Sequence, residues 1–97
     1  MTTYVALCNF TDQGIRNVKE TVHRAEAVQA AGRKFGVEMS NILWTQGAYD
    51  MVVTFEAKDE ASITAFGLAI GMQGNVRTQT LRAHTREEMQ SILNKLG

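Results

Sequence analysis

The sequence has a single cysteine, Cys8, and no proline among its 97 residues. One cysteine cannot form an intrachain disulfide, so the disulfide-stapled scaffold of small secreted proteins is excluded and a cytoplasmic location is expected. Long hydrophobic runs are also missing: no stretch approaches the roughly 20 apolar residues of a membrane-spanning helix. The amino terminus has no basic region leading into an apolar segment, so we expect neither export nor a membrane partner.

Charge of one sign is lacking as well. Ten Lys and Arg residues balance ten Asp and Glu residues, so the formal net charge is zero. Without a global positive field, nucleic acid is not expected as a partner. The two histidines, His23 and His84, lie far apart and neither has a metal-ligand partner at i, i+4, so neither a metal site nor a cofactor is expected.

The chain length and composition suit one domain over residues 1–97, because 44% of the residues are hydrophobic and a chain of this size can fold around one core. Strands are predicted at residues 3–10, 38–46, 51–55 and 75–83, which are rich in apolar and β-branched residues and end at turn residues. Residues 51–55 form an almost continuous apolar run, which is typical of a strand covered on both faces.

Helices are predicted between these strands. Apolar residues recur at gaps of three or four at Ile15, Val18, Val22, Ala25, Val28, Gly32 and Phe35, with a break expected near Thr21 and an end at Gly36. Asp59 is a natural N-cap for a second helix, in which Gly67 and Gly71 indicate either close backbone packing or a loosely wound end. A capping box beginning at Thr85 predicts a short terminal helix.

This order predicts an α+β domain of the ferredoxin-like β-α-β-β-α-β type with a C-terminal helix. Its two main helices cover one face of the sheet and leave the other face open. In the first strand the side chains of Tyr4, Ala6, Cys8 and Phe10 face one way and those of Val5 and Leu7 the other, and both sets are apolar. We therefore expect a homodimer or higher oligomer packed sheet to sheet, unless the terminal helix folds across the open face.

Several short motifs resemble the GYD family of small bacterial and archaeal proteins. They are Thr11-Asp12-Gln13-Gly14-Ile15-Arg16, Arg24-Ala25-Glu26-Ala27, Trp44-Thr45, Gly47-Ala48-Tyr49-Asp50 and Gly74-Asn75-Val76-Arg77-Thr78. The resemblance covers nearly the whole chain and implies a dimeric α/β barrel from a family without an established activity. More distantly, the chain is similar to the effector-binding domain of leucine-responsive regulatory proteins, but it lacks their DNA-binding part. It departs from the GYD pattern at Val22, often proline in relatives, and at Ala48, often acidic.

The leading functional hypothesis is a non-catalytic oligomeric module that binds a small molecule or organises an assembly. Candidate ligand-binding residues are Trp44, Gly47, Tyr49, Asp50 and Arg77. For Gly47 and Asp50 the competing interpretation is structural, as turn geometry and a hydrogen bond to backbone. Trp44 and Tyr49 are the type of residue that is more often a core aromatic than a pocket wall.

The alternative is a cofactor-independent enzyme of the dimeric α/β-barrel oxygenase or isomerase type, with Asp50 as acid or base and Tyr49 or His23 assisting. Cys8 lies among apolar neighbours, which favours a buried, inert thiol over a nucleophile. Arg77 and Arg82 are an odd number of residues apart, so they are expected on opposite faces of the last strand and not in one anion site.

Overall fold

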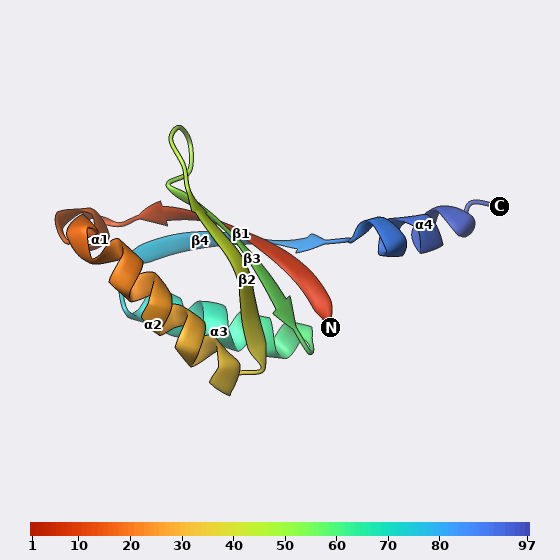
Figure 1. Cartoon of the computed structure of the whole chain (residues 1–97), viewed down its shortest axis with the longest axis horizontal. Helices are drawn as coiled ribbons and strands as arrows, with labels where there is room; N and C mark the ends of the chain where they lie inside the picture. Colours follow the sequence, from red (N-terminus) through yellow and green to blue (C-terminus); the bar gives the residue numbers. More distant parts are fainter.

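The computed structural model describes all 97 residues and shows a four-stranded sheet with helices in the order β-α-β-β-α-β-α (Figure 1). The elements are β1 (Thr2–Phe10), α1 (Asp12–Arg16), the 3-10 helix η1 (Val18–Glu20), α2 (Thr21–Lys34), β2 (Val37–Trp44), β3 (Met51–Ala57), α3 (Glu60–Met72), β4 (Val76–Ala83) and α4 (Arg86–Asn94). This is the predicted ferredoxin-like α+β fold. No helix is long and apolar enough to cross a membrane.

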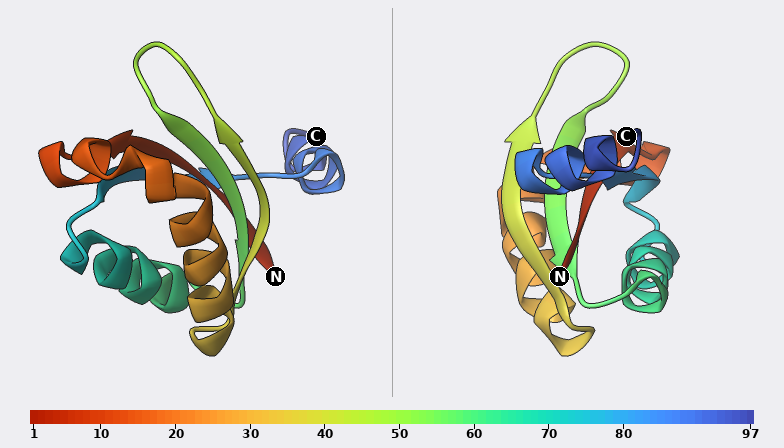
Figure 2. Two further views of the ribbon diagram at one scale, coloured as in Figure 1. Left: turned by 60° about the vertical axis from the view of Figure 1, so that its left-hand side comes forward. Right: turned by 90° about the vertical axis from the view of Figure 1, so that its right-hand side faces the viewer.

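The sheet has the strand order β2-β3-β1-β4, and every neighbouring pair is antiparallel. The two sequence-distant strands β1 and β4 therefore lie side by side, with Cys8 opposite Thr78 in β4 and opposite Met51 in β3. The helices α2 and α3 both lie on one side of the sheet (Figure 2). This arrangement creates a helix-covered face and a helix-free face.

Local hydrogen bonds start α3 and α4 at the predicted residues, whereas α1 begins at Asp12, before the predicted start at Ile15, because Thr11 caps it. The Asp59 side chain accepts from the backbone N–H of Ser62 at 2.7 Å and starts α3, and Thr85 with Glu88 forms a complete capping box for α4. The predicted break near Thr21 is present, because η1 separates α1 from α2. Gly36 follows α2 with a φ of 76°, a left-handed conformation that favours glycine.

The core lies between the helices and the helix-covered face of the sheet. Its buried side chains come from alternate positions of three strands and from α3: Tyr4, Ala6, Cys8, Val37, Met39, Met51, Val53, Phe55, Ala57, Ile63 and Phe66. The Phe66 ring packs against Phe35 with centroids 5.4 Å apart and edge-on against Phe55 at 5.9 Å. Alternation along β1 and β3 thus decides which side chains fill the core.

The predicted apolar stripe of the first helical segment is wrong in its first half. Ile15, Val18 and Val22 are 52%, 37% and 56% exposed, whereas Val28 and Phe35 pack against the core. The reason is that η1 interrupts the helical periodicity, so the two halves do not share one face. In α3, neither Gly67 nor Gly71 is in close contact with another element, because a Cβ atom on either would meet no atom of one within 4 Å. Hydrogen bonds spaced three residues apart, from Gln73 to Ile70 and from Gly74 to Gly71, instead agree with the alternative of an irregular helix end that runs out through Gly74.

The helix-free face has an apolar centre. The strand register aligns Leu43, Val52, Leu7 and Gln79 in one row across the sheet, and Asn41, Thr54, Val5 and Leu81 in the next. Leu43 is 56% exposed and Leu81 is 41% exposed. The residues around this centre, including Glu56 and Arg77, are polar.

The terminal helix does not cover this face. It extends beyond the end of the sheet, away from the rest of the chain (Figure 1). Its apolar residues Met89, Ile92 and Leu93 are all exposed, as is Leu96 after its end. The alternative in which the chain's own tail roofs the sheet is therefore wrong, and the single chain leaves two apolar surfaces uncovered.

Candidate functional site

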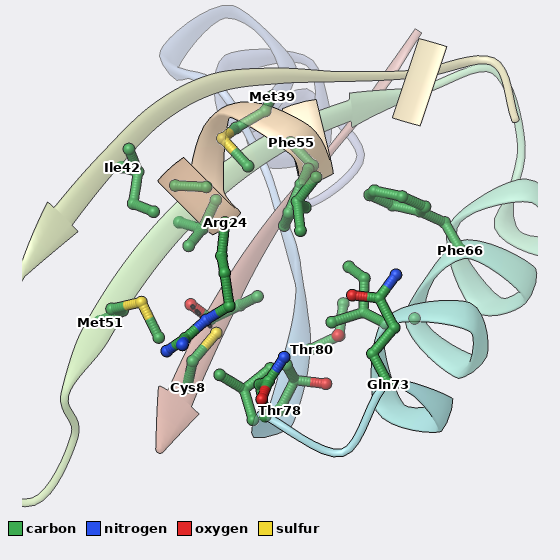
Figure 3. A pocket seen from close by; sticks show the side chains of 18 of the residues that line it. Cys8, Arg24, Met39, Ile42, Met51, Phe55, Phe66, Gln73, Thr78 and Thr80 are labelled. Carbon is green, nitrogen blue, oxygen red and sulfur yellow. Dashed lines mark hydrogen bonds between the residues drawn. The ribbon is translucent and has the colours of Figure 1, made fainter. Parts of the chain in front are cut away.

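A cavity lies between the sheet and the helices α2 and α3 (Figure 3). Of its 21 lining residues, 14 are hydrophobic. The cavity volume that the centre of a water molecule can occupy is about 80 Å³. That exceeds the space of a single water molecule several times over. The size and apolar lining suit a small organic group better than an ion.

The cavity forms because the two helices meet closely at one end only. A Cβ atom on Gly32 of α2 would lie 3.1 Å from the Phe66 ring of α3, so the absence of a side chain there permits close approach. On the β4 side, the sheet contributes the small side chains of Thr78 and Thr80, which do not fill the space. The polar lining residues Arg24 and Gln73 come from the start of α2 and the end of α3.

Arg24 directs its guanidinium group into the space that Cys8 and Met51 also line (Figure 3). Its terminal nitrogens donate to the backbone oxygens of Asn17 at 2.7 Å and Gly14 at 3.2 Å. No acidic residue lines the cavity, and Arg24 takes part in neither of the two ion pairs of the structure. The one formal charge of the lining is therefore positive and has no carboxylate partner.

Cys8 is the only nucleophilic sulfur at the cavity. Its side chain is buried, and burial raises the pKa of the thiol from 9.0 to about 11. The Sγ atom lies 3.9 Å from the carbonyl oxygen of Ala6, which its S–H can reach as a weak donor. The predicted burial of Cys8 is confirmed, and the raised pKa favours a protonated thiol at neutral pH.

Asp50 does not line the cavity. It precedes β3 and forms hydrogen bonds with β1. Its backbone N–H donates to the Cys8 oxygen at 2.8 Å, and its carboxylate accepts from the backbone N–H of Phe10 at 2.9 Å. The turn before it is closed by Thr45, whose hydroxyl donates to the Tyr49 oxygen at 2.6 Å, and Gly47 has a φ of 98°. The Gly-Ala-Tyr-Asp segment thus lies in the loop between β2 and β3 and is hydrogen-bonded to β1.

Trp44 and Tyr49 lie on opposite faces of the sheet. The Tyr49 hydroxyl donates to Oε1 of Gln79 at 3.1 Å, on the helix-free face. The Trp44 indole donates to the hydroxyl of Thr21 at the start of α2, at 3.0 Å on the helix-covered face, and the residue is 41% exposed. The structure therefore does not bring these two aromatics and Asp50 into one pocket.

The remaining sequence candidates are also dispersed. His23 is exposed on α2 and does not line the cavity. Arg77 pairs with Asn9 on the helix-free face, whereas Arg82 lies over the Tyr4 ring on the helix-covered face, 5.7 Å from its centroid. The prediction that these two arginines face opposite sides is confirmed.

Two of the quoted motifs meet in space beside the cavity. The Thr11 backbone N–H donates to the Asn75 oxygen at 3.1 Å, and its hydroxyl donates to the Gly74 oxygen at 2.5 Å. The Gln13 amide donates to Oδ1 of Asn75 at 2.9 Å and to the Gln73 oxygen at 3.0 Å. The Thr-Asp-Gln-Gly segment is thereby fastened to the turn before β4.

The cavity residues Arg24, Thr78 and Thr80 were not among the predicted site residues. The sequence contained one indication of the position of Arg24. It lies one helical turn before Val28, which packs on the core, so the Arg24 side chain starts from the core-facing side of α2. The alternation of Val76, Thr78 and Thr80 also places them on one face. That this face adjoins an unfilled space depends on the packing of α2 and α3.

The comparison with protein families matches the GYD domain over residues 4–93. The chain belongs to the GYD domain family. The match covers nearly the whole sequence, as the resemblance in its motifs predicted. A comparison with curated proteins gave no match. In this GYD protein, the Gly-Ala-Tyr-Asp turn is tied to β1 through the hydrogen bonds of Asp50 with Cys8 and Phe10.

Proposed function

We propose that this GYD protein is a non-catalytic, self-associating module that binds a small, largely apolar molecule between its helices and its sheet. The observation that carries the proposal is the cavity, with 14 hydrophobic residues among the 21 that line it and a few polar groups. Ligand sites in proteins have this composition: apolar walls provide affinity and a few polar groups orient the ligand.

The chemistry of the lining favours binding over catalysis. The Cys8 thiol, with a pKa of about 11, is a poor nucleophile at neutral pH. Asp50, the residue considered as acid or base in the enzyme alternative, does not line the cavity, and its carboxylate accepts from the Phe10 backbone. An acid or base must lie within hydrogen-bond reach of the proton it transfers, so Asp50 is not positioned to act on a molecule in the cavity.

Self-association accounts for the two uncovered apolar surfaces. On the helix-free face, Leu43 and Leu81 flank the half-buried Val5, Leu7 and Val52. At about 25 cal/mol per Å² of apolar surface removed from water, burying this centre against a second copy contributes several kcal/mol. The exposed apolar side of α4 adds a second surface of the same kind.

A thermal-shift experiment tests the binding proposal. The probes are 1-octanol, octanoate, benzyl alcohol, benzoate and indole, and a molecule selective for the folded state raises the apparent melting temperature by mass action. Ala25→Phe places a ring in the cavity lining, whereas Ala27→Phe adds the same ring at an exposed position of the same helix. We expect at least one probe to stabilise the natural protein and Ala27→Phe but not Ala25→Phe.

Two results would reject the binding proposal. One is the absence of any stabilisation by the five probes. The other is equal stabilisation of the Ala25→Phe and Ala27→Phe variants, which would place the probe outside the cavity.

A further inference from the structure

We infer that the cavity selects molecules with an apolar body and a monoanionic head group, such as a carboxylate, and that Arg24 holds the head group. This inference rests on the proposed binding function and names its ligand class. The decisive feature is that Arg24 is the only charged residue of the lining.

The guanidinium group of Arg24 is held in place and still has donors to offer. Its contacts with the backbone oxygens of Asn17 and Gly14 use one N–H on each terminal nitrogen. A guanidinium carries five N–H donors, so three remain for a ligand. Since both acceptors are backbone atoms of the segment before α2, the group is already oriented before a ligand arrives, which lowers the cost of binding.

Neutral donors also line the cavity. Thr21 accepts a hydrogen bond from the Trp44 indole, so its own hydroxyl hydrogen is available to an anion. Gln73 and Asn75 contribute side-chain amides to the same cavity. A carboxylate would replace its lost water contacts with N–H and O–H donors, as charged groups leaving water require.

The apolar part of the ligand would contact the hydrocarbon side chains of the lining. These include Phe55, Phe66, Val53 and Ile70. A cationic head group would face the Arg24 charge without an acidic residue to offset it, and an alcohol would gain hydrogen bonds but no charge attraction. The lining therefore ranks anionic above neutral above cationic molecules of the same chain length.

Calorimetric titration of octanoate, 1-octanol and octylamine into the intact protein at low salt tests this ranking. We expect octanoate to bind roughly tenfold to a hundredfold more tightly than 1-octanol, as for a hydrogen bond to a charged group, and octylamine more weakly than either. The Arg24→Gln variant should reduce the octanoate preference to about threefold or less. Arg33→Gln removes a charge from an exposed position of the same helix and should keep the preference.

The outcomes separate the two proposals. Equal affinity of the unaltered protein for octanoate and 1-octanol overturns the anion preference and leaves the binding function standing; absence of binding by all three molecules overturns both. An undiminished preference in Arg24→Gln assigns the head group to another residue and overturns the role of Arg24. Because the three-molecule comparison in the unaltered protein needs no variant, poor folding of Arg24→Gln does not leave the ranking untested.

Discussion

The carbonyl oxygen of Asn75 lies where the side chain of Gly14 would begin: a Cβ atom on Gly14 would be only 1.9 Å from it. This close approach brings together the end of the first helical turn and the turn before β4, which are far apart in the sequence. Thr11 fastens the same two segments through its backbone N–H and its hydroxyl. Two of the motifs that mark the family therefore have a structural role at one junction.

Substitution of Gly14 by alanine should destabilise the protein by about 3 kcal/mol or more, because the backbone of Asn75 has to move. Gly71→Ala is the matched control, since a Cβ atom there meets nothing within 4 Å. Alanine in that helical position should be neutral or stabilising by up to about 1 kcal/mol. Urea denaturation measures both changes, and similar stabilities for the two variants would contradict the close contact.

Asp50 should prove to be a structural residue. Asp50→Ala leaves the Phe10 backbone N–H without its acceptor and should cost about 1–3 kcal/mol of unfolding free energy. Asp50→Asn keeps an oxygen acceptor and should cost less. Neither variant should change the affinity for a cavity ligand once the protein is folded; a loss of affinity in a folded Asp50→Asn variant would restore this carboxylate as a ligand contact.

The Cys8 thiol should make stability fall at alkaline pH. Its pKa is 9.0 when unperturbed and about 11 in the folded protein, so the folded state holds the proton more tightly. The resulting stability is fully present below pH 9 and is lost as the pH rises toward 11. This rise of the pKa corresponds to on the order of 2–3 kcal/mol. The difference in unfolding free energy between the natural protein and Cys8→Ala, measured from pH 8 to 11, gives the contribution of the Cys8 thiol.

In that comparison other titrating groups cancel, because both proteins contain the same tyrosines and lysines. A difference that stays constant between pH 8 and pH 11 would show that the thiol is not desolvated. We also expect a thiol reagent to alkylate Cys8 slowly at neutral pH and faster only when denaturant unfolds the protein, because the folded thiol is buried and protonated.

Self-association should depend on the apolar centre of the helix-free face. Sedimentation at micromolar concentration should show a dimer or larger assembly for the natural protein. Leu43→Glu and Leu81→Glu should each raise the dissociation constant of the assembly tenfold or more, because a charge would be buried in the contact. Leu68→Glu is the control, since Leu68 is 66% exposed on α3, outside that face. A monomeric natural protein would refute the proposal.

The order of the elements and the caps of α3 and α4 were predictable from the sequence because they depend on neighbours in the chain. Asp59 bonds to a backbone group three residues away, and the Thr85 capping box also closes within four residues. Gly36 ends α2 through its own backbone angle. Such interactions need no knowledge of the rest of the fold, so their sequence patterns are reliable guides.

The candidate site depended on contacts between distant segments, and its prediction from the sequence was correspondingly poorer. The alternation of β1 correctly placed Cys8 in the core, yet the sequence could not show that Arg24 would point into the same space. Trp44 and Tyr49 lie close in the sequence, but a strand end and a turn send them to opposite faces of the sheet.

The sequence by itself determined the α+β element order, the helix caps and the apolar character of both faces of β1. Only the tertiary structure decided where the helices leave a cavity, which face Tyr49 occupies, and that α4 extends away from the sheet. The physical reason is the range of the interactions. Caps and alternation act over a few residues, whereas the cavity and the two uncovered apolar surfaces arise from how whole elements pack together.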